Sequence, residues 1–251
     1  MASDIPTAVR RLCLSFPEAE EFVSHGAPTY RMRGKSFATF TVNHHGDGHV
    51  ALLVCAMPGA AAAHVAAEPK HYFIPPYVGP RGWLGVELNQ GISWKRVAMH
   101  AREAYAQVAP RTLVSALPDT IAVASPKKKM SAIEIDPLQA PKAKRALAAL
   151  RGICLGWPGV SEDAQFGHTV WRVGKRVFVR AYDRDGRMTV CAWVGVPQQS
   201  LMTQDARYTV PPYFGHQGWI ALDVSGGLNA DEVRGLVEQS YRHFGPKRGA
   251  R

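Results

Sequence analysis

Hydrophobic and polar positions predict a helix at the start of each half of the chain. Asp4 is a polar N-cap candidate and Pro6 suits a first helical turn, so we expect a helix that ends before Pro17. A longer and more basic helix is expected near residues 141–155, again ending before a proline, Pro158.

A basic hairpin follows each of these helices. Large apolar and basic residues alternate over residues 30–33, which is typical of a half-buried strand. Gly34-Lys35 then turns the chain into a second strand over residues 36–42. The second half repeats this pattern with residues 171–173, the turn Gly174-Lys175 and residues 176–182.

Each half continues with an apolar strand, a helix and a proline-rich segment. Asp47-Gly48 and Asp185-Gly186 favour hairpin turns, because both central positions of such turns have positive φ. The two Pro-Pro-Tyr segments are expected to be extended by their prolines. The apolar strands cover residues 50–54 and 188–193, and the helices begin at Pro58 and Pro197.

Each half ends with an alternating strand and an amphipathic helix. Leu84, Val86 and Leu88 share one face of the first strand, opposite Trp83 and Glu87, and we expect the aliphatic face to be buried. Ile220, Leu222 and Val224 repeat this stripe. The helices are expected over residues 93–108 and 229–244, and Asn229 with Glu232 makes a capping-box pattern.

The similarity of the halves is an internal duplication. Residues 75–111 align with residues 211–247 without a gap. The identical pairs are Pro75/Pro211, Pro76/Pro212, Tyr77/Tyr213, Gly79/Gly215, Gly82/Gly218, Trp83/Trp219, Gly91/Gly227, Val97/Val233, Tyr105/Tyr241 and Pro110/Pro246.

The predicted order of elements in each copy is helix, three strands, helix, two strands, helix. Hairpin-linked strands of this kind form an antiparallel sheet, so the fold class is α+β with two tandem copies of one unit. We assign residues 1–113 to the first copy and 141–251 to the second. Residues 114–140, with their prolines and Lys127–Lys129, are expected to be a linker.

Composition and charge indicate a globular and basic protein. Hydrophobic residues make up 46% of the 251 residues, and no run of 18 or more apolar residues predicts a membrane span. The start of the chain lacks a signal-peptide pattern and the four cysteines are scattered among apolar neighbours, so we expect a cytoplasmic protein with reduced cysteines. The net charge of +10 makes an anionic partner a reasonable hypothesis.

The sequence PPYVGPRGW, the tyrosine near the end of the last helix and the Gly-Lys hairpin resemble the MmcQ/YjbR family of bacterial proteins. The resemblance covers roughly residues 5–113 and 146–248, whereas members of the family usually have one such unit. It implies a double-wing, frataxin-like α+β fold similar to a phage DNA-binding domain. Family members are commonly called DNA-binding, so the resemblance implies DNA as a partner.

The basic hairpins are the first candidate site. Their bases alternate with apolar residues and should project from one face, where they could neutralise phosphates of a duplex. The alternative is that they are ordinary solvated charges of edge strands. The candidate residues are Arg31, Arg33 and Lys35 in the first copy and Arg172, Lys175, Arg176 and Arg180 in the second.

The aromatic residues of the Pro-Pro-Tyr and Gly-Trp segments are the second candidate. Tyr77 and Trp83, with Tyr213 and Trp219 in the second copy, could line a cleft for a small ligand or a protein. The alternative is structural packing against the prolines, which is the more common role of such rings.

Catalytic and metal-binding patterns are weak. The sequence has no G-x-S-x-G, P-loop, G-x-G-x-x-G after a strand or H-E-x-x-H motif. The histidines of residues 44–49 lack a complementary cluster in the second copy, and Glu21 and Glu162 coincide but are more typical of ion-pair partners. We therefore expect no enzyme activity, cofactor or metal, and a binding protein whose leading partner is DNA. A protein-interaction or small-ligand module is the alternative.

Overall fold

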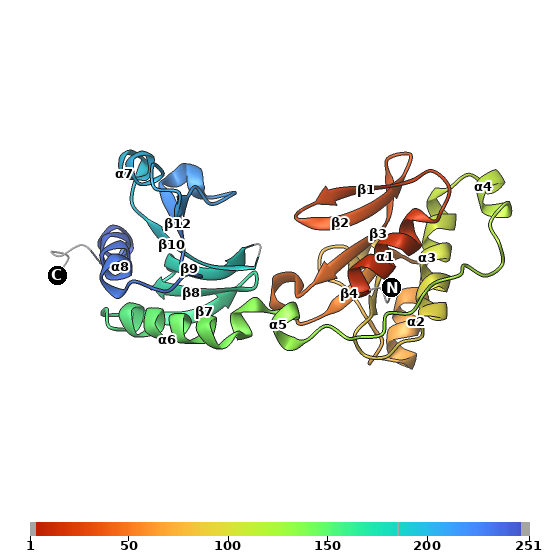
Figure 1. Ribbon diagram of the computed structural model, residues 1–251, viewed down its shortest axis with the longest axis horizontal. Coiled ribbons are helices and arrows are strands. Elements are labelled where there is room, and N and C mark those ends of the chain that lie inside the picture. The colour runs from red at the N-terminus through yellow and green to blue at the C-terminus, as the bar shows by residue number, and fades with distance from the viewer. Residues whose placement is uncertain (1–3, 185, 247–251) are drawn as a thin grey trace. The chain divides into compact units, whose positions relative to one another are not determined.

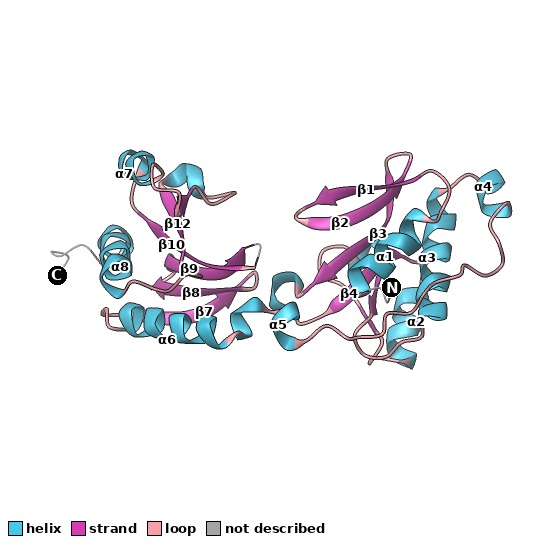
Figure 2. Cartoon of the chain, viewed as in Figure 1, coloured by secondary structure: helices cyan, strands magenta, loops and turns pink. Residues whose placement is uncertain are grey.

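The computed structural model describes residues 4–184 and 186–246 and divides the chain into two compact units. The first unit contains Met1–His44 and Gly48–Ser131, and the second contains His45–Asp47 and the chain from Ala132 onward. Each unit combines one sheet with helices (Figures 1 and 2). Part of the expected linker is structured: Asn89 exchanges two hydrogen bonds with the backbone of Met130 in the first unit, and Leu138 packs against the core of the second.

The first unit has a six-stranded antiparallel sheet in the order β1-β2-β3-β4-β6-β5. Its elements are α1 (Ile5–Leu14), β1 (Ala19–Ser24), β2 (Ala27–Met32), β3 (Lys35–Val42), β4 (Val50–Cys55), α2 (Ala60–Ala67), β5 (Tyr72–Phe73), β6 (Trp83–Glu87) and α3 (Trp94–Val108), followed by the short α4 (Arg111–Ser115).

The second unit repeats this topology, with the strand order β7-β8-β9-β10-β12-β11. After the short α5 (Ala132–Ile135), its elements are α6 (Pro141–Leu155), β7 (Val160–Gln165), β8 (His168–Val173), β9 (Arg176–Arg184), β10 (Arg187–Trp193), α7 (Val196–Met202), β11 (Tyr208–Thr209), β12 (Trp219–Asp223) and α8 (Ala230–Phe244). The predicted α+β duplication is confirmed.

The predicted number of strands was wrong by one in each unit. The chain forms β1 and β7 before the hairpins, so four strands precede the second helix. Both are edge strands, and their sequences, AEEFVS and VSEDAQ, are too polar to show apolar alternation.

The Pro-Pro-Tyr segments are turns, which corrects the prediction of extended chain. Tyr77 has φ +64° and Tyr213 has φ +66°. The amide of Val78 donates to the carbonyl of Pro76 at 2.7 Å, and Phe214 repeats this bond to Pro212 at 2.8 Å. A hydrogen bond that spans one residue closes a three-residue turn, which the proline pattern alone does not predict.

Of the two predicted Asp-Gly hairpin turns, the one at Asp47-Gly48 was incorrect. The β3–β4 connection is a longer loop in which Asn43, His45, Gly46 and Gly48 have positive φ, whereas Asp47 does not. In the second unit Arg184 pairs directly with Arg187 across the turn, and Asp185 lies outside the described residues.

The capping box of α8 forms only in part. The side chain of Asn229 accepts hydrogen bonds from the amides of Asp231 and Glu232. The Glu232 carboxylate accepts instead from the hydroxyl of Tyr208 and from Arg207. Only the Asn229 half of the capping box is therefore formed, because the Glu232 carboxylate is used in a tertiary contact.

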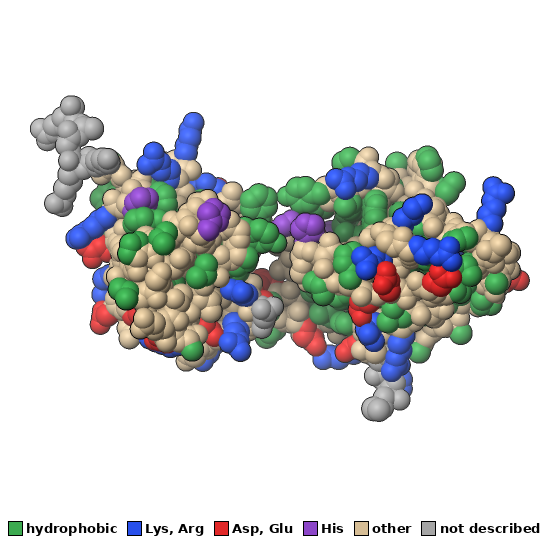
Figure 3. Space-filling model, turned by 90° about the horizontal axis from the view of Figure 1, so that it is seen from above, with side chains coloured by type: hydrophobic (Ala, Val, Ile, Leu, Met, Phe, Trp, Pro, Cys, Tyr) green, Lys and Arg blue, Asp and Glu red, His purple; other side chains and the backbone are tan. Residues whose placement is uncertain are grey.

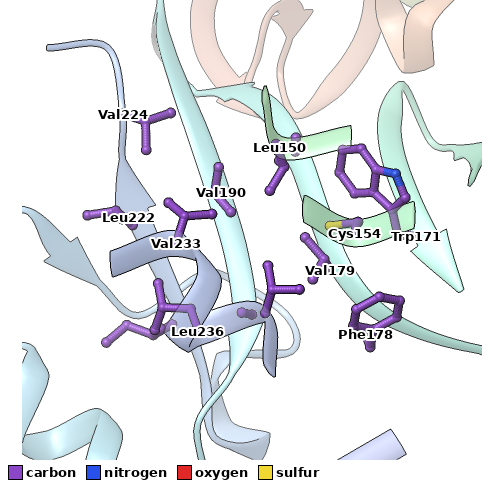
Figure 4. Close-up of a cluster of buried hydrophobic side chains, with 14 of the residues drawn as sticks. Leu150, Cys154, Trp171, Phe178, Val179, Val190, Leu222, Val224, Val233 and Leu236 are labelled. Carbon is purple, nitrogen blue, oxygen red and sulfur yellow. The ribbon is translucent and has the colours of Figure 1, made fainter. Parts of the chain in front are cut away.

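The core of the second unit lies between its sheet and the helices α6 and α8. Leu222 and Val224 point toward Val233 and Leu236 of α8, while Trp171 lies near Leu150 and Cys154 of α6 (Figure 4). The predicted aliphatic stripe is buried in both units, which confirms it: Leu84, Val86, Leu88, Ile220, Leu222 and Val224 are each 4% exposed or less.

The helices in the described part of the chain are all too short or too polar to cross a membrane.

Candidate nucleic-acid interface

The two basic hairpins form where the sequence predicts them. In the first unit Arg33 and Gly34, with φ +46° and +79°, make the turn between β2 and β3. Tyr30 and Met32 point into the core, where each is 1% exposed, so alternation places Arg31 and Arg33 on the opposite side.

The arginines of the first hairpin are paired with acids in the neighbouring strand β1 or directly before it. The Nε of Arg31 donates to Glu20 at 2.7 Å and the guanidinium lies over the ring of Phe22. Arg33 forms a bidentate pair with Glu18, at 2.7 and 3.0 Å. These hydrogen bonds lower the pKa of Glu18 and raise the pKa of Arg33. Much of the positive charge of this hairpin is thus compensated within the unit, while Lys35 is exposed.

The tip of the second hairpin lacks this compensation. Strand register pairs Ala19 with Met32 in the first unit and Val160 with Val173 in the second. The residues just outside these pairs are Glu18 and Arg33 in the first unit, and Gly159 and Gly174 in the second. Lys175 and Arg176 are exposed at this tip. Among the described residues, no carboxylate lies within ion-pair distance of either base.

A hollow of about 750 Å³ opens beside this tip. The two glycines contribute no side chains that would fill it. Its lining consists of Pro158, Gly159, Val173, Gly174, Lys175, Arg176, Phe244, Gly245 and Pro246.

The other two candidate bases of the second unit are less exposed than those at the tip, although Arg172 donates to the tip carbonyl of Lys175 at 3.5 Å. Arg172 is 3.3 Å from Asp163, with 23% of its side chain exposed. Arg180 is half-buried in the middle of β9, where its guanidinium lies 5.0 Å from the centre of the Phe214 ring. The structure therefore separates the exposed pair Lys175 and Arg176 from the more buried pair Arg172 and Arg180.

The aromatic candidates do not act as a group. Tyr77 is 61% exposed and Tyr213 is 82% exposed, whereas Trp219 is only 5% exposed. Trp219 packs edge-on against Phe214, with ring centres 5.5 Å apart, and Trp83 is half-buried. None of these four residues lines the hollow beside Lys175, and none lines a second hollow, beside Glu21 in the first unit.

The matched carboxylates Glu21 and Glu162 are ion-pair partners. Arg10 of α1 donates to Glu21 at 2.7 Å, and the hydroxyl of Tyr30 donates to the same carboxylate. In the second unit Glu162 accepts both from Arg151 and from the indole of Trp171. Because each glutamate connects the first helix of its unit to a buried aromatic residue, both have a structural role. Glu21 also borders a hollow of about 430 Å³ in the first unit.

A partly buried polar network in the first unit was missed by sequence reasoning. The hydroxyl of Tyr72 lies 2.9 Å from Nε2 of His100 and accepts from Arg96 at 2.7 Å. Arg96 also forms a bidentate pair with Glu68, whose pKa it lowers to about 2. These residues are far apart in the sequence, and only the packing of α3 on β5 brings them together. The described residues contain no group of three or more His, Cys, Asp or Glu side chains that could hold a metal ion.

His100 should make the stability of the first unit depend on pH. It is 2% exposed, and burial, with smaller contributions from the charges of His64 and Arg96, lowers its pKa to about 4. The unfolded chain takes up a proton near the ordinary pKa of about 6.5, whereas the folded unit resists protonation until about pH 4. We therefore expect the free energy of unfolding of the first unit to fall by roughly 3 kcal/mol as the pH falls through this interval.

The matched variant is His100→Leu, because position 236 of α8, at the same distance from its N-cap as His100, carries leucine. Urea unfolding at several pH values should show a shallower decline for this variant than for the wild-type chain. Parallel pH profiles would show that His100 does not titrate differently in the two states.

On the face of the molecule seen in Figure 3, the Lys and Arg side chains do not form one cluster. They are spread singly among Asp and Glu. Local pairing therefore decides which bases are available to a partner, and the tip at Lys175 and Arg176 differs from the first hairpin in this respect.

The fold and the paired hairpins define a duplicated α+β protein of a known class. The YjbR family model matches residues 14–107 and again residues 155–243. The chain belongs to the YjbR family and carries two copies of its unit.

The other comparisons add little. A crystal structure of the Deinococcus radiodurans protein DR2400, with the domain DUF419, is similar at 18% identity and a TM-score of 0.36. The match covers 42% of this chain and 81% of that one. No curated protein matches the sequence.

Proposed function

We propose that this protein binds nucleic acid without catalysing a reaction, and that the β8–β9 hairpin of the second unit makes the main phosphate contacts. The supporting observation is the exposed pair Lys175 and Arg176, which has no carboxylate partner among the described residues. Unpaired bases gain more from a phosphate than paired ones, because no internal ion pair has to be broken.

The dimensions and charge of the hairpin suit double-stranded DNA. A two-stranded ribbon fits the major groove of a duplex, and two neighbouring bases at its tip can each neutralise a phosphate. The net charge of +10 adds a long-range attraction for a polyanion. Binding of this kind is largely independent of sequence, since phosphate contacts carry no base information.

The state of the cysteines supports a non-catalytic role. Burial raises the pKa of Cys191 to about 12 and that of Cys55 to about 11. Cys13 and Cys154 are buried as well, and burial also raises the pKa of each. At neutral pH these side chains stay as thiols, which are poor nucleophiles.

A salt titration with random duplex DNA tests the proposal. The logarithm of the affinity should fall linearly with the logarithm of the salt concentration, with a slope set by the number of phosphates contacted. Lys175→Ala/Arg176→Ala should weaken binding at low salt and reduce this slope by about two, equally on unrelated duplexes. Fluorescence anisotropy of a labelled duplex measures both quantities.

The first hairpin supplies the matched control. Arg31→Ala/Arg33→Ala removes the same number of bases, but these arginines are paired with Glu20 and Glu18. We expect a clearly smaller change in slope for this variant. Equal slopes for both double variants would contradict the assignment to the second hairpin, and absence of duplex binding by the wild-type chain would contradict nucleic-acid binding altogether.

The Pro-Pro-Tyr turns support a second candidate function, docking of a protein or a small ligand. Tyr213 combines 82% exposure with φ +66°, and Tyr77 has the same conformation at 61% exposure. A non-glycine residue held in this region is strained by about 1–3 kcal/mol, and such strain occurs often at functional sites. Val210 and Leu201 are also exposed in the second unit. Loss of binding to a partner on Tyr213→Ala, with duplex binding unchanged, would favour this function.

A further inference from the structure

The outer face of the second sheet carries an arginine that the first unit lacks. Strand register pairs Val170 with Arg180 in the second unit and Thr29 with Thr39 in the first, so Arg180 takes the place of a threonine. Trp171 and Val179 point into the core, which places Arg180 and Arg172 together on the opposite face. They are diagonal neighbours on adjacent strands, within reach of each other's long side chains.

The guanidinium groups of this pair have unused donors. The Nε atoms of Arg172 and Arg180 are both buried without a hydrogen-bond partner among the described residues. Asp163 lies 3.3 Å from Arg172, but the geometry is not that of a hydrogen bond. Within the described part of the chain, the one hydrogen bond of the Arg180 side chain is a 3.3 Å bond to the side-chain oxygen of Gln165.

The surroundings of Arg180 are aromatic, and no acid among the described residues forms an ion pair with it. Its guanidinium lies 5.0 Å from the ring centre of Phe214 and 6.0 Å from that of Trp219. Burial lowers the pKa of Arg180, and the positive charge of Arg172 lowers it further. A partly buried cation beside a second cation is unfavourable unless an anion or hydrogen bonds offset the loss of water.

We infer that Arg172 and Arg180 form a site for the phosphate group of a small molecule on the outer face of the second unit. A phosphate offers several acceptor oxygens for the two planar guanidinium groups, which bind such groups with directed hydrogen bonds. It would also supply a negative charge to Arg180, since Asp163 offsets the charge of Arg172 alone. This site uses different residues from the hairpin tip, and the inference does not rest on nucleic-acid binding.

The substitution that tests the site comes from the protein itself. Arg180→Thr introduces the residue found at the matching position, Thr39, and Arg172→Ala removes the second guanidinium. Arg176→Ala, at the exposed tip of the same unit, removes a positive charge outside the site and serves as the control. Far-UV circular dichroism and the thermal midpoint without ligand establish that each variant is folded.

Binding of inorganic phosphate and of phenyl phosphate is measured by calorimetry on the full chain at constant ionic strength. We expect one site per chain, at least tenfold weaker binding in Arg180→Thr and Arg172→Ala, and unchanged binding in Arg176→Ala. Tryptophan fluorescence should respond to phosphate in the wild-type chain and respond less in Trp219→Phe, since this indole lies beside Arg180. Binding of phenyl phosphate alone would still place a phosphate group at the site and would point to an organic ligand.

Three results would overturn the inference. One is the same phosphate affinity in Arg180→Thr as in the wild-type chain. Another is equal binding of acetate, which would remove the preference for phosphate. The third is loss of phosphate binding in Arg176→Ala to the same extent, which would indicate general charge attraction. A failure of duplex binding is a separate outcome, because Lys175→Ala/Arg176→Ala should lose duplex contacts and still bind inorganic phosphate.

Discussion

Replacing Leu222 by alanine is expected to lower the free energy of unfolding of the second unit by about 2–5 kcal/mol. Leu222 is 1% exposed in the middle of β12, and it belongs to the cluster between the sheet and α8. Truncation removes buried apolar surface and leaves a cavity that the surrounding strands can fill only in part. Leu84→Ala should have a similar effect in the first unit, because Leu84 is equally buried at the first position after Trp83.

Guanidinium unfolding of the full chain, followed by circular dichroism, measures these losses. Leu201→Ala is the control: this leucine lies on α7 and is 61% exposed, so its truncation should change stability by less than about 0.5 kcal/mol. A loss below that value for Leu222→Ala would mean that the core of the second unit is packed differently from the arrangement in Figure 4.

Gly218→Ala is expected to destabilise the second unit more than Gly82→Ala destabilises the first, although the two glycines occupy the same position of the repeat. Both have positive φ, +89° and +84°, which costs an alanine about 1–2 kcal/mol. At Gly218 an added Cβ would also lie 2.7 Å from Cα of Gly195, a backbone atom. At Gly82 the nearest atom is the carbonyl oxygen of Ala56, at an ordinary 3.7 Å.

The close approach at Gly218 is held in place by hydrogen bonds. Its carbonyl accepts from the amides of Val194 and Gly195, at 2.9 and 3.0 Å. An alanine must therefore push apart two bonded backbone segments, which we expect to add about 1–3 kcal/mol to the backbone strain. Thermal or denaturant unfolding of the two single variants gives the comparison, and equal losses would rule out the steric contribution.

The two units share one fold but differ in how their charges are arranged. The first hairpin holds Arg31 and Arg33 in ion pairs, while the second presents Lys175 and Arg176 beside a hollow. The ion pair between the last helix and the segment before β5 or β11 has opposite charges in the two units. The helix supplies the base, Arg96, in the first unit and the acid, Glu232, in the second. We expect a duplication with such differences to divide its roles, with ligand contacts concentrated in the second unit.

The amino-acid sequence by itself determined the duplication, the α+β class and most of the elements. The helix α6 begins and ends at the predicted residues, because Pro141 favours a first turn and Pro158 prevents continuation soon after Leu155. The aliphatic stripes were found because the side-chain period of a strand is fixed at two, so one face of each strand had to be apolar. The resemblance to a known family rested on the same repeated residues.

Strands β1 and β7 were missed because they are stabilised by tertiary contacts. Their apolar content is low, and they form because their backbones pair with β2 and β8 and their acids bind arginines of other elements, as Glu21 binds Arg10. The local sequence of a strand does not indicate which distant residues it will pair with. The turn at Tyr77 was missed for a similar reason, since prolines restrict φ but do not specify which residue after them adopts a left-handed conformation.

Only the tertiary structure decided which bases are available to a ligand. The sequence placed Arg33, Lys175 and Arg180 in one class of basic strand residues. In the folded units Arg33 is neutralised by Glu18, Lys175 stays exposed, and Arg180 is half-buried against Phe214. These outcomes depend on residues that lie up to several strands away, because the free energy of a charge is set by its solvent exposure and by the charges that folding brings near it.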